Sequence, residues 1–306
     1  MTSSTTTTAS PLTFAFIGFS EAGQALGGGL VKAGAGRVAA YDLRFDGAEG
    51  AELMARAKAL GVEAAACAKD AAAEADVIVS TVTAAAAVAV AQEAAGFIGR
   101  GQVFLDLNSI SPKQKRACAA AIEAAGGSYV EGAVMSPVGS FGHTVPMLFA
   151  GAATAPLAER LKPLGMEIEV VGPDIGVASA IKMCRSIVLK GLEALTVECL
   201  VTARAYGIED RVTASLDQTL PGLNWPERST YMLGRVLAHG ARRAEEMRCA
   251  AETVRAIGLE PVMCEAAAAR QQWVADLGLK PASAKGPQAG NPVDALIGAG
   301  GVTPLG

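Results

Sequence analysis

A strand-like run that leads directly into a glycine turn constrains the fold of this chain more than any other feature. Residues 14–17 are apolar, Gly18 follows them, and Gly23 lies in the predicted first turn of a helix. Such a junction directs backbone N–H groups and the positive end of a helix dipole at one point, which favours a pyrophosphate. Ser20 replaces the middle glycine of the full Gly-x-Gly-x-x-Gly fingerprint. We predict that the phosphates of a dinucleotide bind at Gly18, Phe19, Ser20, Glu21, Ala22 and Gly23.

An acidic residue at the end of the next predicted strand supports the same site. Asp42 closes the strand-like run 37–41, about 20 residues after the glycine turn, where a carboxylate binds the ribose hydroxyls of NAD. The same carboxylate would repel the 2′-phosphate of NADP, and Arg44 would partly offset that repulsion. NAD is therefore the predicted cofactor, and NADP stays open. The alternative is that the glycines only form a turn and that Asp42 only caps a strand end.

Composition and charge exclude several classes of protein. The 306 residues are 51% hydrophobic and 18% charged, which suits a folded protein with a large core. A net charge of −4 argues against a nucleic-acid surface. Six scattered cysteines without Cys-x-x-Cys spacing and only two histidines predict reduced thiols in a cytoplasmic protein, and no metal site. No targeting segment or membrane-spanning run is visible, so we expect no membrane partner.

The order of apolar runs predicts an α/β protein with a helical second part. Short β-like runs alternate with Ala-rich helical segments, as in a doubly wound, Rossmann-type parallel sheet. A helix of about 30 residues, some 45 Å long, then joins this sheet to an all-α C-terminal domain and favours a homodimer or larger assembly. The predicted parts are a disordered head (1–11), a dinucleotide-binding domain (12–172), the long helix (173–206), an all-α domain (207–280) and a flexible tail (281–306).

One lysine near the start of the long helix is the candidate for proton transfer. Lys182 follows small residues one turn earlier, Ala178 and Ser179, so it can lie against a cavity. Burial and a positive nicotinamide ring would lower its pKa, and it could then take the hydroxyl proton of an alcohol that is oxidised. The alternative is a solvated helix lysine. Ligands bind at the carboxyl ends of such strands, which adds Thr81, Val82 and Asn108 to the predicted cofactor contacts.

Four motifs follow one another in order between residues 12 and 205. They are the glycine turn 18–23, the segments 106–112 and 131–134, and the segment 172–176 followed by Lys182. Together they resemble the motifs of the β-hydroxyacid dehydrogenases, a family that includes 3-hydroxyisobutyrate, tartronate-semialdehyde and 6-phosphogluconate dehydrogenases. Residues 231–247 resemble the C-terminal domain of a less characterised branch. The resemblance implies that Lys182 is the catalytic acid/base and that Ser109 and the 131–136 loop hold the substrate carboxylate.

Two departures from the family pattern fall where substrate is expected. Met135-Ser136-Pro137 stands where the family usually has Ser-Gly-Gly, and Ser186 replaces an Asn one turn after the lysine. A bulkier, more rigid loop predicts a substrate other than 3-hydroxyisobutyrate. The predicted substrate contacts are Ser109, Met135, Ser136, Arg185, Ser186, His239 and Arg242. For Arg242 the alternative is a helix salt bridge with Glu246.

The predicted activity is hydride transfer between NAD and a small, anionic β-hydroxy acid or sugar acid. Which acid is used, and whether decarboxylation follows oxidation, stays open. One alternative is an NADPH-dependent enzyme like the imine reductases, which resemble this fold but usually carry Asp or Tyr where Lys182 stands. The other is a non-catalytic nucleotide-binding protein that kept the fold and lost the chemistry.

Overall fold

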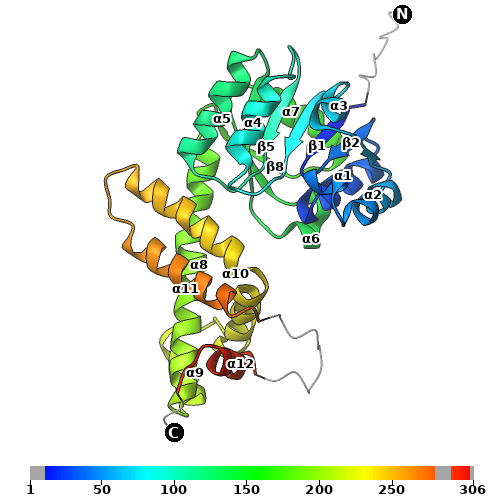
Figure 1. The fold of residues 1–306 in the computed structure, drawn as a ribbon. Coiled ribbons are helices and arrows are strands. Elements are labelled where there is room, and N and C mark those ends of the chain that lie inside the picture. Colours follow the sequence, from blue (N-terminus) through cyan, green and yellow to red (C-terminus); the bar gives the residue numbers. More distant parts are fainter. Residues whose placement is uncertain (1–10, 280–290, 304–306) are drawn as a thin grey trace, which may run out of the picture. The chain divides into compact units, whose positions relative to one another are not determined.

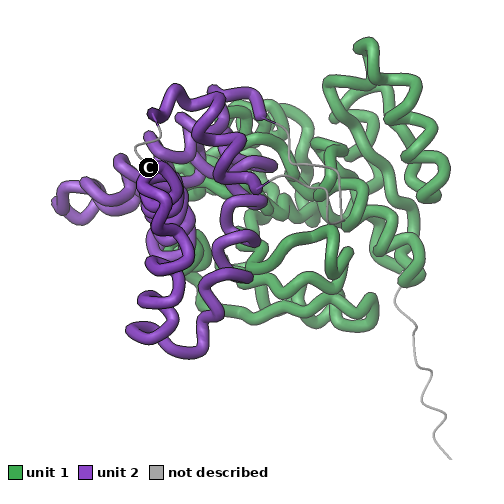
Figure 2. Tube along the Cα trace, turned by 90° about the horizontal axis from the view of Figure 1, so that it is seen from below, with its two compact units in different colours: residues 1–182 green, residues 183–306 purple. Residues whose placement is uncertain are grey.

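The computed structural model describes residues 11–279 and 291–303. The chain divides into two compact units, residues 1–182 and 183–306 (Figure 2). The predicted head, apart from Pro11, lies outside the described residues, as do residues 280–290 and 304–306 around and within the predicted tail.

The first unit is built on one eight-stranded sheet (Figure 1). Its strand order is β3-β2-β1-β4-β5-β6-β7-β8, and neighbouring strands run parallel except for the antiparallel pair β6 and β7. The strands are β1 Phe14–Ile17, β2 Val38–Tyr41, β3 Glu63–Ala64, β4 Val77–Ser80, β5 Val103–Asp106, β6 Ser128–Val134, β7 Met147–Ala150 and β8 Ile168–Gly172. Because β1 lies between β2 and β4, the strand order reverses beside the glycine turn, where such sheets bind ligands. The predicted Rossmann-type fold is confirmed.

Helices cover both faces of this sheet. They are α1 Glu21–Lys32, α2 Gly50–Ala59, α3 Ala68–Ala72, α4 Ala87–Ala95, α5 Pro112–Ala124, α6 Val138–Phe141 and α7 Thr154–Leu161, with the 3-10 turns η1 Leu43–Asp46, η2 Gly142–Thr144 and η3 Lys162–Leu164. Phe14 and Phe16 of β1 pack in one core with residues of α1, α2 and α7, whereas Ala15 and Ile17 belong to the opposite core with α3, α4 and α5. Burial on both faces explains why these strands are continuous apolar runs without alternation.

Local sequence signals explain where individual elements begin. Helix α5 starts with the predicted capping box, because the Ser111 hydroxyl accepts the Gln114 N–H and the Gln114 side chain accepts the Ser111 N–H. By contrast, β3 has no hydrophobic pattern, and its two residues are exposed, so no strand is predicted there from the sequence. Pairing with β2 alone defines this short edge strand.

The second unit is helical. Helix α8, Val177–Ala205, has 29 residues and begins in the first unit. It is followed by α9 Glu209–Thr219, α10 Trp225–Arg255, α11 Val262–Asp276 and α12 Pro292–Ala299. Leu200, Val236 and Leu296 are among the residues of its core. The predicted flexible tail therefore differs from the structure over α12, whose buried Val293 and Leu296 pack into that core.

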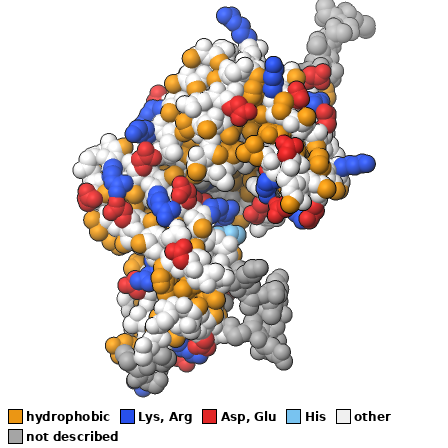
Figure 3. Space-filling model, viewed as in Figure 1, with side chains coloured by type: hydrophobic (Ala, Val, Ile, Leu, Met, Phe, Trp, Pro, Cys, Tyr) orange, Lys and Arg blue, Asp and Glu red, His pale blue; other side chains and the backbone are white. Residues whose placement is uncertain are grey.

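No helix within the described ranges is long and apolar enough to cross a membrane. On the face drawn in Figure 3, Lys and Arg side chains are interspersed with Asp and Glu rather than gathered in a basic patch.

Candidate functional site

The glycine turn after β1 is formed by residues that allow very close backbone approach. Gly18 has φ +95°, and a Cβ atom there would lie 2.5 Å from the Thr81 carbonyl oxygen. A Cβ atom on Gly23 would lie 2.4 Å from the Gly18 carbonyl oxygen. The Thr81 hydroxyl donates to that same carbonyl at 2.7 Å, which ties the turn to the end of β4. A side chain at either position would collide with backbone atoms of the chain itself, so this tight turn needs glycines, as does the turn that cradles a pyrophosphate in dinucleotide sites.

The start of α1 is exposed at the glycine turn. Ser20 is the N-cap residue with an extended backbone, and its side chain makes no capping hydrogen bond. Ser20 and Glu21 are exposed, while Phe19 is fully buried and anchors the turn in the core. The N-terminal N–H groups of a helix have no partner within the helix, so this end suits an anionic ligand.

The side chain of Asp42 is hydrogen-bonded directly to the glycine turn. Its Oδ2 accepts the Phe19 N–H at 2.7 Å, and its two carboxylate oxygens also accept the Arg44 guanidinium at 2.9 and 3.0 Å. Burial would raise the pKa of Asp42, but hydrogen bonds from Arg44 and the Phe19 backbone outweigh it and hold that pKa below its ordinary value. The ionised carboxylate therefore stands beside the turn, as a ribose-binding role needs, with the half-exposed Arg44 side chain over it.

The loops after β4 and β5 form a second polar surface. The Asn108 side chain accepts the Val82 N–H at 2.8 Å and donates to the Ser80 hydroxyl at 2.9 Å. Next to it, the hydroxyl oxygen of Ser109 is buried and has no hydrogen-bond partner within the described chain. A buried hydroxyl without a partner is costly unless a ligand or water completes it, so Ser109 fits a ligand contact.

A buried ion pair lies next to these loops, and the sequence alone does not predict it. The Lys115 ammonium lies 3.0 Å from Asp106 Oδ1, and both side chains are 1% exposed. Asp106 also accepts the Tyr129 hydroxyl at 2.7 Å and the Asn108 N–H at 2.9 Å. Burial raises the pKa of Tyr129 well above its ordinary value, so its hydroxyl stays a donor. The one sequence signal for Lys115 is its place on the apolar face of α5, with Cys118 and Ile122.

Hydrogen bonds to Glu131 connect the N-terminal end of α8 to β6, and sequence patterns do not reveal this contact. Glu131 is fully buried, and its carboxylate accepts the backbone N–H groups of Gly176 at 2.6 Å and Ser179 at 2.5 Å. Lys182, three residues further along the helix, is half-buried. The predicted 131–136 loop is strand β6 as far as Val134, and Met135 packs against a small cluster that includes Ala178, so the end of β6 and the start of α8 lie together.

The remaining predicted substrate contacts belong to the second unit. Arg185 is exposed there, and Ser186 is 4% exposed with a hydroxyl that accepts the Lys190 ammonium at 2.8 Å. His239 has non-helical backbone angles at a kink within α10, where Gly240 allows close approach to α11. The first unit ends at Lys182, and these residues lie in the second unit. That they share one site with the residues of the first unit remains a prediction.

The salt-bridge alternative for Arg242 applies in part. Its guanidinium lies 4.0 Å from Glu246, a weak contact on the exposed side of α10, whereas Lys190 lies 2.8 Å from the same carboxylate. A closer pair joins α8 to α10 deeper in the unit, with Arg243 Nη1 2.5 Å from Glu193 Oε2. Burial raises the pKa of Glu193 and lowers the pKa of Arg243.

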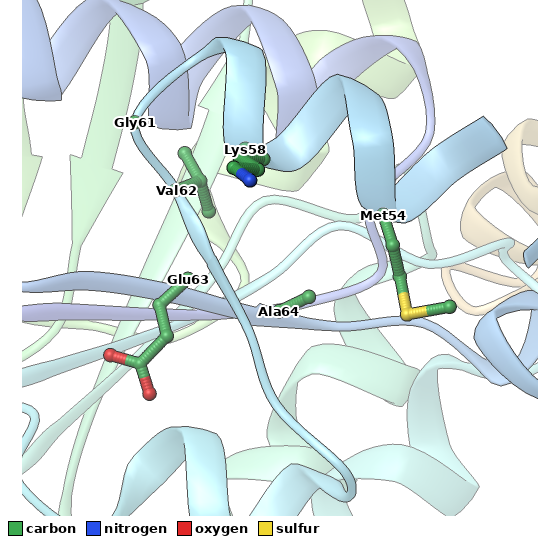
Figure 4. Close-up of a pocket in the computed structure, with 6 residues that line it drawn as sticks. All are labelled: Met54, Lys58, Gly61, Val62, Glu63 and Ala64. Carbon is green, nitrogen blue, oxygen red and sulfur yellow. The ribbon is translucent and has the colours of Figure 1, made fainter. Parts of the chain in front are cut away.

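Two surface hollows contain none of the predicted site residues. One, of about 460 Å³, lies between α2 and β3 (Figure 4) and is lined by Met54, Lys58, Gly61, Val62, Glu63 and Ala64. The other, of about 440 Å³, is lined by residues of α8, α9 and the turn between them. Neither presents convergent polar groups like those at the carboxyl ends of β1, β4 and β5. Within the described residues, no cluster of His, Cys, Asp or Glu is arranged to hold a metal ion.

Known proteins resemble both parts of the chain. Residues 13–163 match the NAD-binding domain of 6-phosphogluconate dehydrogenase, and residues 203–274 match a domain of unknown function, DUF1932. A solved structure of a conserved hypothetical protein from Sinorhizobium meliloti 1021 is 43% identical, with coverage of 96% of each chain and a TM-score of 0.72.

Two further relatives connect this chain to dehydrogenases. A solved protein of unknown function, whose structure was described as similar to 3-hydroxyacid dehydrogenases, is 30% identical over 87% of this chain and 97% of its own, with a TM-score of 0.68. The NAD-dependent L-serine dehydrogenase of Pseudomonas aeruginosa is 29% identical over 69% of this chain and 70% of its own length.

Proposed function

From the premise that this chain belongs to the β-hydroxyacid dehydrogenase family, we propose that it transfers a hydride between NAD and a small β-hydroxy acid, with Lys182 as general acid/base. The family membership makes the chain a hydroxyacid dehydrogenase that uses a nicotinamide dinucleotide. One observation supports the proposal most: the Asp42 carboxylate accepts the Phe19 N–H of the glycine turn, so the proposed ribose and pyrophosphate sites would adjoin.

The dinucleotide would lie across the carboxyl ends of β1 and β4. Backbone N–H groups of residues 18–23 would bind the pyrophosphate, and the cradle at Gly18 and Gly23 supports this role. Asp42 would accept the ribose hydroxyls, and Thr81, Val82 and Asn108 would border the nicotinamide half. Bound NAD would supply the hydride acceptor for oxidation of the substrate alcohol.

The residues of the chain would bind the acid and move the hydroxyl proton. Ser109, with its buried and unpartnered hydroxyl, and Ser136 would hold the carboxylate. The neutral Lys182 amine would take the proton as the carbinol C–H bond breaks, and the lysine would then be an ammonium ion. In the reverse direction the same ammonium would return a proton to the carbonyl oxygen. Arg185, Ser186, His239 and Arg242 would complete the site from the second unit.

The acid is expected to be small and to differ from 3-hydroxyisobutyrate. Met135 packs against the cluster that contains Ala178 of α8, where a family member with Ser at this position would leave more space. L-serine is itself a β-hydroxy acid, and the Pseudomonas aeruginosa relative is named for it, so it belongs in the first set of test substrates. Sugar acids of comparable size are the second set.

The decisive experiment is a screen of three- and four-carbon β-hydroxy acids, L-serine and sugar acids with both NAD and NADP. We expect formation of reduced nicotinamide with at least one acid, and faster turnover with NAD. Reduction of a cyclic imine by NADPH without oxidation of any acid would instead support the imine reductase alternative. Tight binding of NADH without turnover of any compound would support a non-catalytic nucleotide-binding protein.

We also propose that the chain assembles as a homodimer or a larger assembly through α8 and the C-terminal domain. Large apolar side chains are exposed along this helix, among them Val188, Leu189 and Leu195. Monomeric proteins seldom expose extended apolar stripes. Light scattering coupled to size exclusion should give at least twice the chain mass; a monomer at micromolar concentration would contradict the proposal.

A further inference from the structure

A buried carboxylate outside the predicted reaction chemistry holds the helix that carries Lys182. Glu131 lies in β6, where it pairs in register with Ala150 of β7, and its side chain is fully buried. Both carboxylate oxygens accept backbone N–H groups of the α8 start, Oε2 from Gly176 and Oε1 from Ser179. Hydrogen bonds in which a carboxylate accepts backbone N–H groups are of the charge-assisted kind, which is stronger than the neutral kind.

The physical consequence is that the helix start is fixed to the sheet. The first N–H groups of a helix have no partner within the helix and carry the positive end of its dipole. A buried carboxylate, in turn, is stable only when its charge is compensated and its oxygens are hydrogen-bonded. The Glu131 carboxylate and the N–H groups at the start of α8 therefore supply each other's hydrogen-bond partners. Without one of them, the other would be buried with no partner.

Tight packing restricts the same turn from other sides. Gly176 has φ +109°, and a Cβ atom there would lie 2.6 Å from Arg116 Nη1 and 3.2 Å from Pro112 Cβ, both in α5. Ala178 is fully buried among Ala133 and Leu148 of β6 and β7. The turn that precedes Lys182 thus has little freedom to move relative to the sheet.

We propose that Glu131 is the positioning residue for Lys182, holding the first turn of α8 against β6 and setting the electrostatic environment of the lysine amine. This inference rests on the proposed function in that Lys182 is the acid/base. Ser179 is three residues before Lys182 and so belongs to the adjacent turn of the same helix face. The carboxylate that is hydrogen-bonded to the Ser179 N–H is therefore attached to the helix one turn before Lys182.

Among the charged groups around this turn, Glu131 is the one that supplies negative charge to the start of α8. On the neighbouring elements, Lys115 and Asp106 pair with each other, and Tyr129 keeps its proton. The Arg116 guanidinium of α5 contributes a positive charge near Gly176. The exposed Asp174 precedes α8 and is screened by solvent. Loss of the Glu131 charge would thus leave the positive helix end and Arg116 uncompensated and would favour the neutral form of Lys182.

The test measures the proton affinity of Lys182 without using turnover. Competitive acetylation of the folded protein across pH, read by peptide mass spectrometry, gives the pKa of each lysine. The variants are Glu131→Gln, which removes the charge and keeps the shape, and Glu131→Asp, which keeps the charge. Glu169→Gln on the exposed strand β8 is the matched control, and Lys162 is the reference amine.

We expect Glu131→Gln to lower the pKa of Lys182 by about one unit, while Glu131→Asp and Glu169→Gln leave it within a few tenths of a unit. Once an acid substrate is known, the acidic limb of the kcat profile should shift to lower pH by the same amount. The dissociation constant for NADH should not change. These results would separate a positioning role from a purely structural one.

Two results would overturn the inference. One is a folded Glu131→Gln protein in which the pKa of Lys182 equals that of the wild type. The other applies if Glu131→Gln does not fold: it is a folded Glu131→Asp protein in which the pKa of Lys182 departs from the wild-type value by about one unit, because that variant retains the charge. Failure of the proposed function is a different outcome, namely a Lys182→Ala protein that retains full turnover whatever residue stands at 131.

Discussion

The Asp42 carboxylate accepts the backbone N–H of Phe19 at 2.7 Å, so the end of β2 is bonded to the glycine turn that follows β1. The two sequence features that predict a dinucleotide site are therefore one hydrogen-bonded unit. Arg44 binds the same carboxylate with two N–H groups and completes that unit.

Removal of the Asp42 charge should change cofactor preference. Asp42→Asn replaces one of the two carboxylate acceptors with an N–H donor and removes the charge that repels a 2′-phosphate, so we expect about tenfold weaker NADH binding. NADPH binding should weaken less or improve. Fluorescence titration of both reduced cofactors measures the ratio of dissociation constants, and Asp46→Asn in the same 3-10 turn is the control. An unchanged ratio would argue against the assignment of Asp42.

The glycine turn should not accept a single methyl group. Gly23→Ala places a Cβ atom 2.4 Å from the Gly18 carbonyl oxygen, so the turn must open and the pyrophosphate cradle is deformed. We expect NADH affinity to fall by at least tenfold, equivalent to about 1.4 kcal/mol. Gly99→Ala, whose added Cβ would make only an ordinary contact at 3.7 Å, is the matched control. Equal affinities for the two variants would show that the cradle does not bind the cofactor.

Loss of the buried Lys115 ammonium should be costly. Lys115→Met leaves Asp106 charged and without its cation in the core, and removal of one partner of a buried pair costs about 3–5 kcal/mol. The free energy of unfolding from urea titration measures this. Lys113→Met, an exposed position on the same helix, should change it by less than about 0.5 kcal/mol. A small effect at Lys115 would mean that Tyr129 and Asn108 satisfy Asp106 unaided.

The Glu193–Arg243 pair predicts a pH dependence in the second unit. Burial raises the pKa of Glu193, so the folded state binds its proton more strongly than the unfolded state does. The contribution of this group is fully present below the unfolded pKa of about 4.3 and is lost as pH rises through the folded pKa. Glu193→Gln should lack that decline, whereas Glu198→Gln, exposed on the same helix, should keep it. Parallel stability curves for wild type and Glu193→Gln between acid and neutral pH would contradict this.

Much of the fold could be predicted because apolar runs and glycine turns report it directly. The continuous apolar strands and the capping box at Ser111 identify the parallel sheet and the start of α5. The edge strand β3 has no such pattern, because both its residues are exposed. Helix α12 follows a Gly- and Pro-rich segment, so its sequence does not predict a helix. Its place in the fold is given by the packing of Leu296 into the helical core.

The predicted site depends on both local pattern and tertiary contacts. The roles predicted for Gly18 and Asp42 come from local sequence and have matching contacts in the first unit. Lys115 and Glu131 escape prediction, because a lysine or glutamate is ordinarily exposed and their partners are distant in sequence. Glu131 is 45 residues from Gly176, a separation over which no local periodicity operates. Such buried charges become visible only once the strands and helices are assembled.

Lys182 is proposed to exchange the hydroxyl proton beside bound NAD, and Lys182→Ala removes the amine that this step needs. General acid–base catalysis contributes about 10²–10⁴-fold, so kcat with the best acid should fall by that factor. NADH binding should stay as in wild type, and Lys162→Ala, an exposed lysine, should retain full activity. A Lys182→Ala protein with near-wild-type kcat would rule out Lys182 as the acid/base.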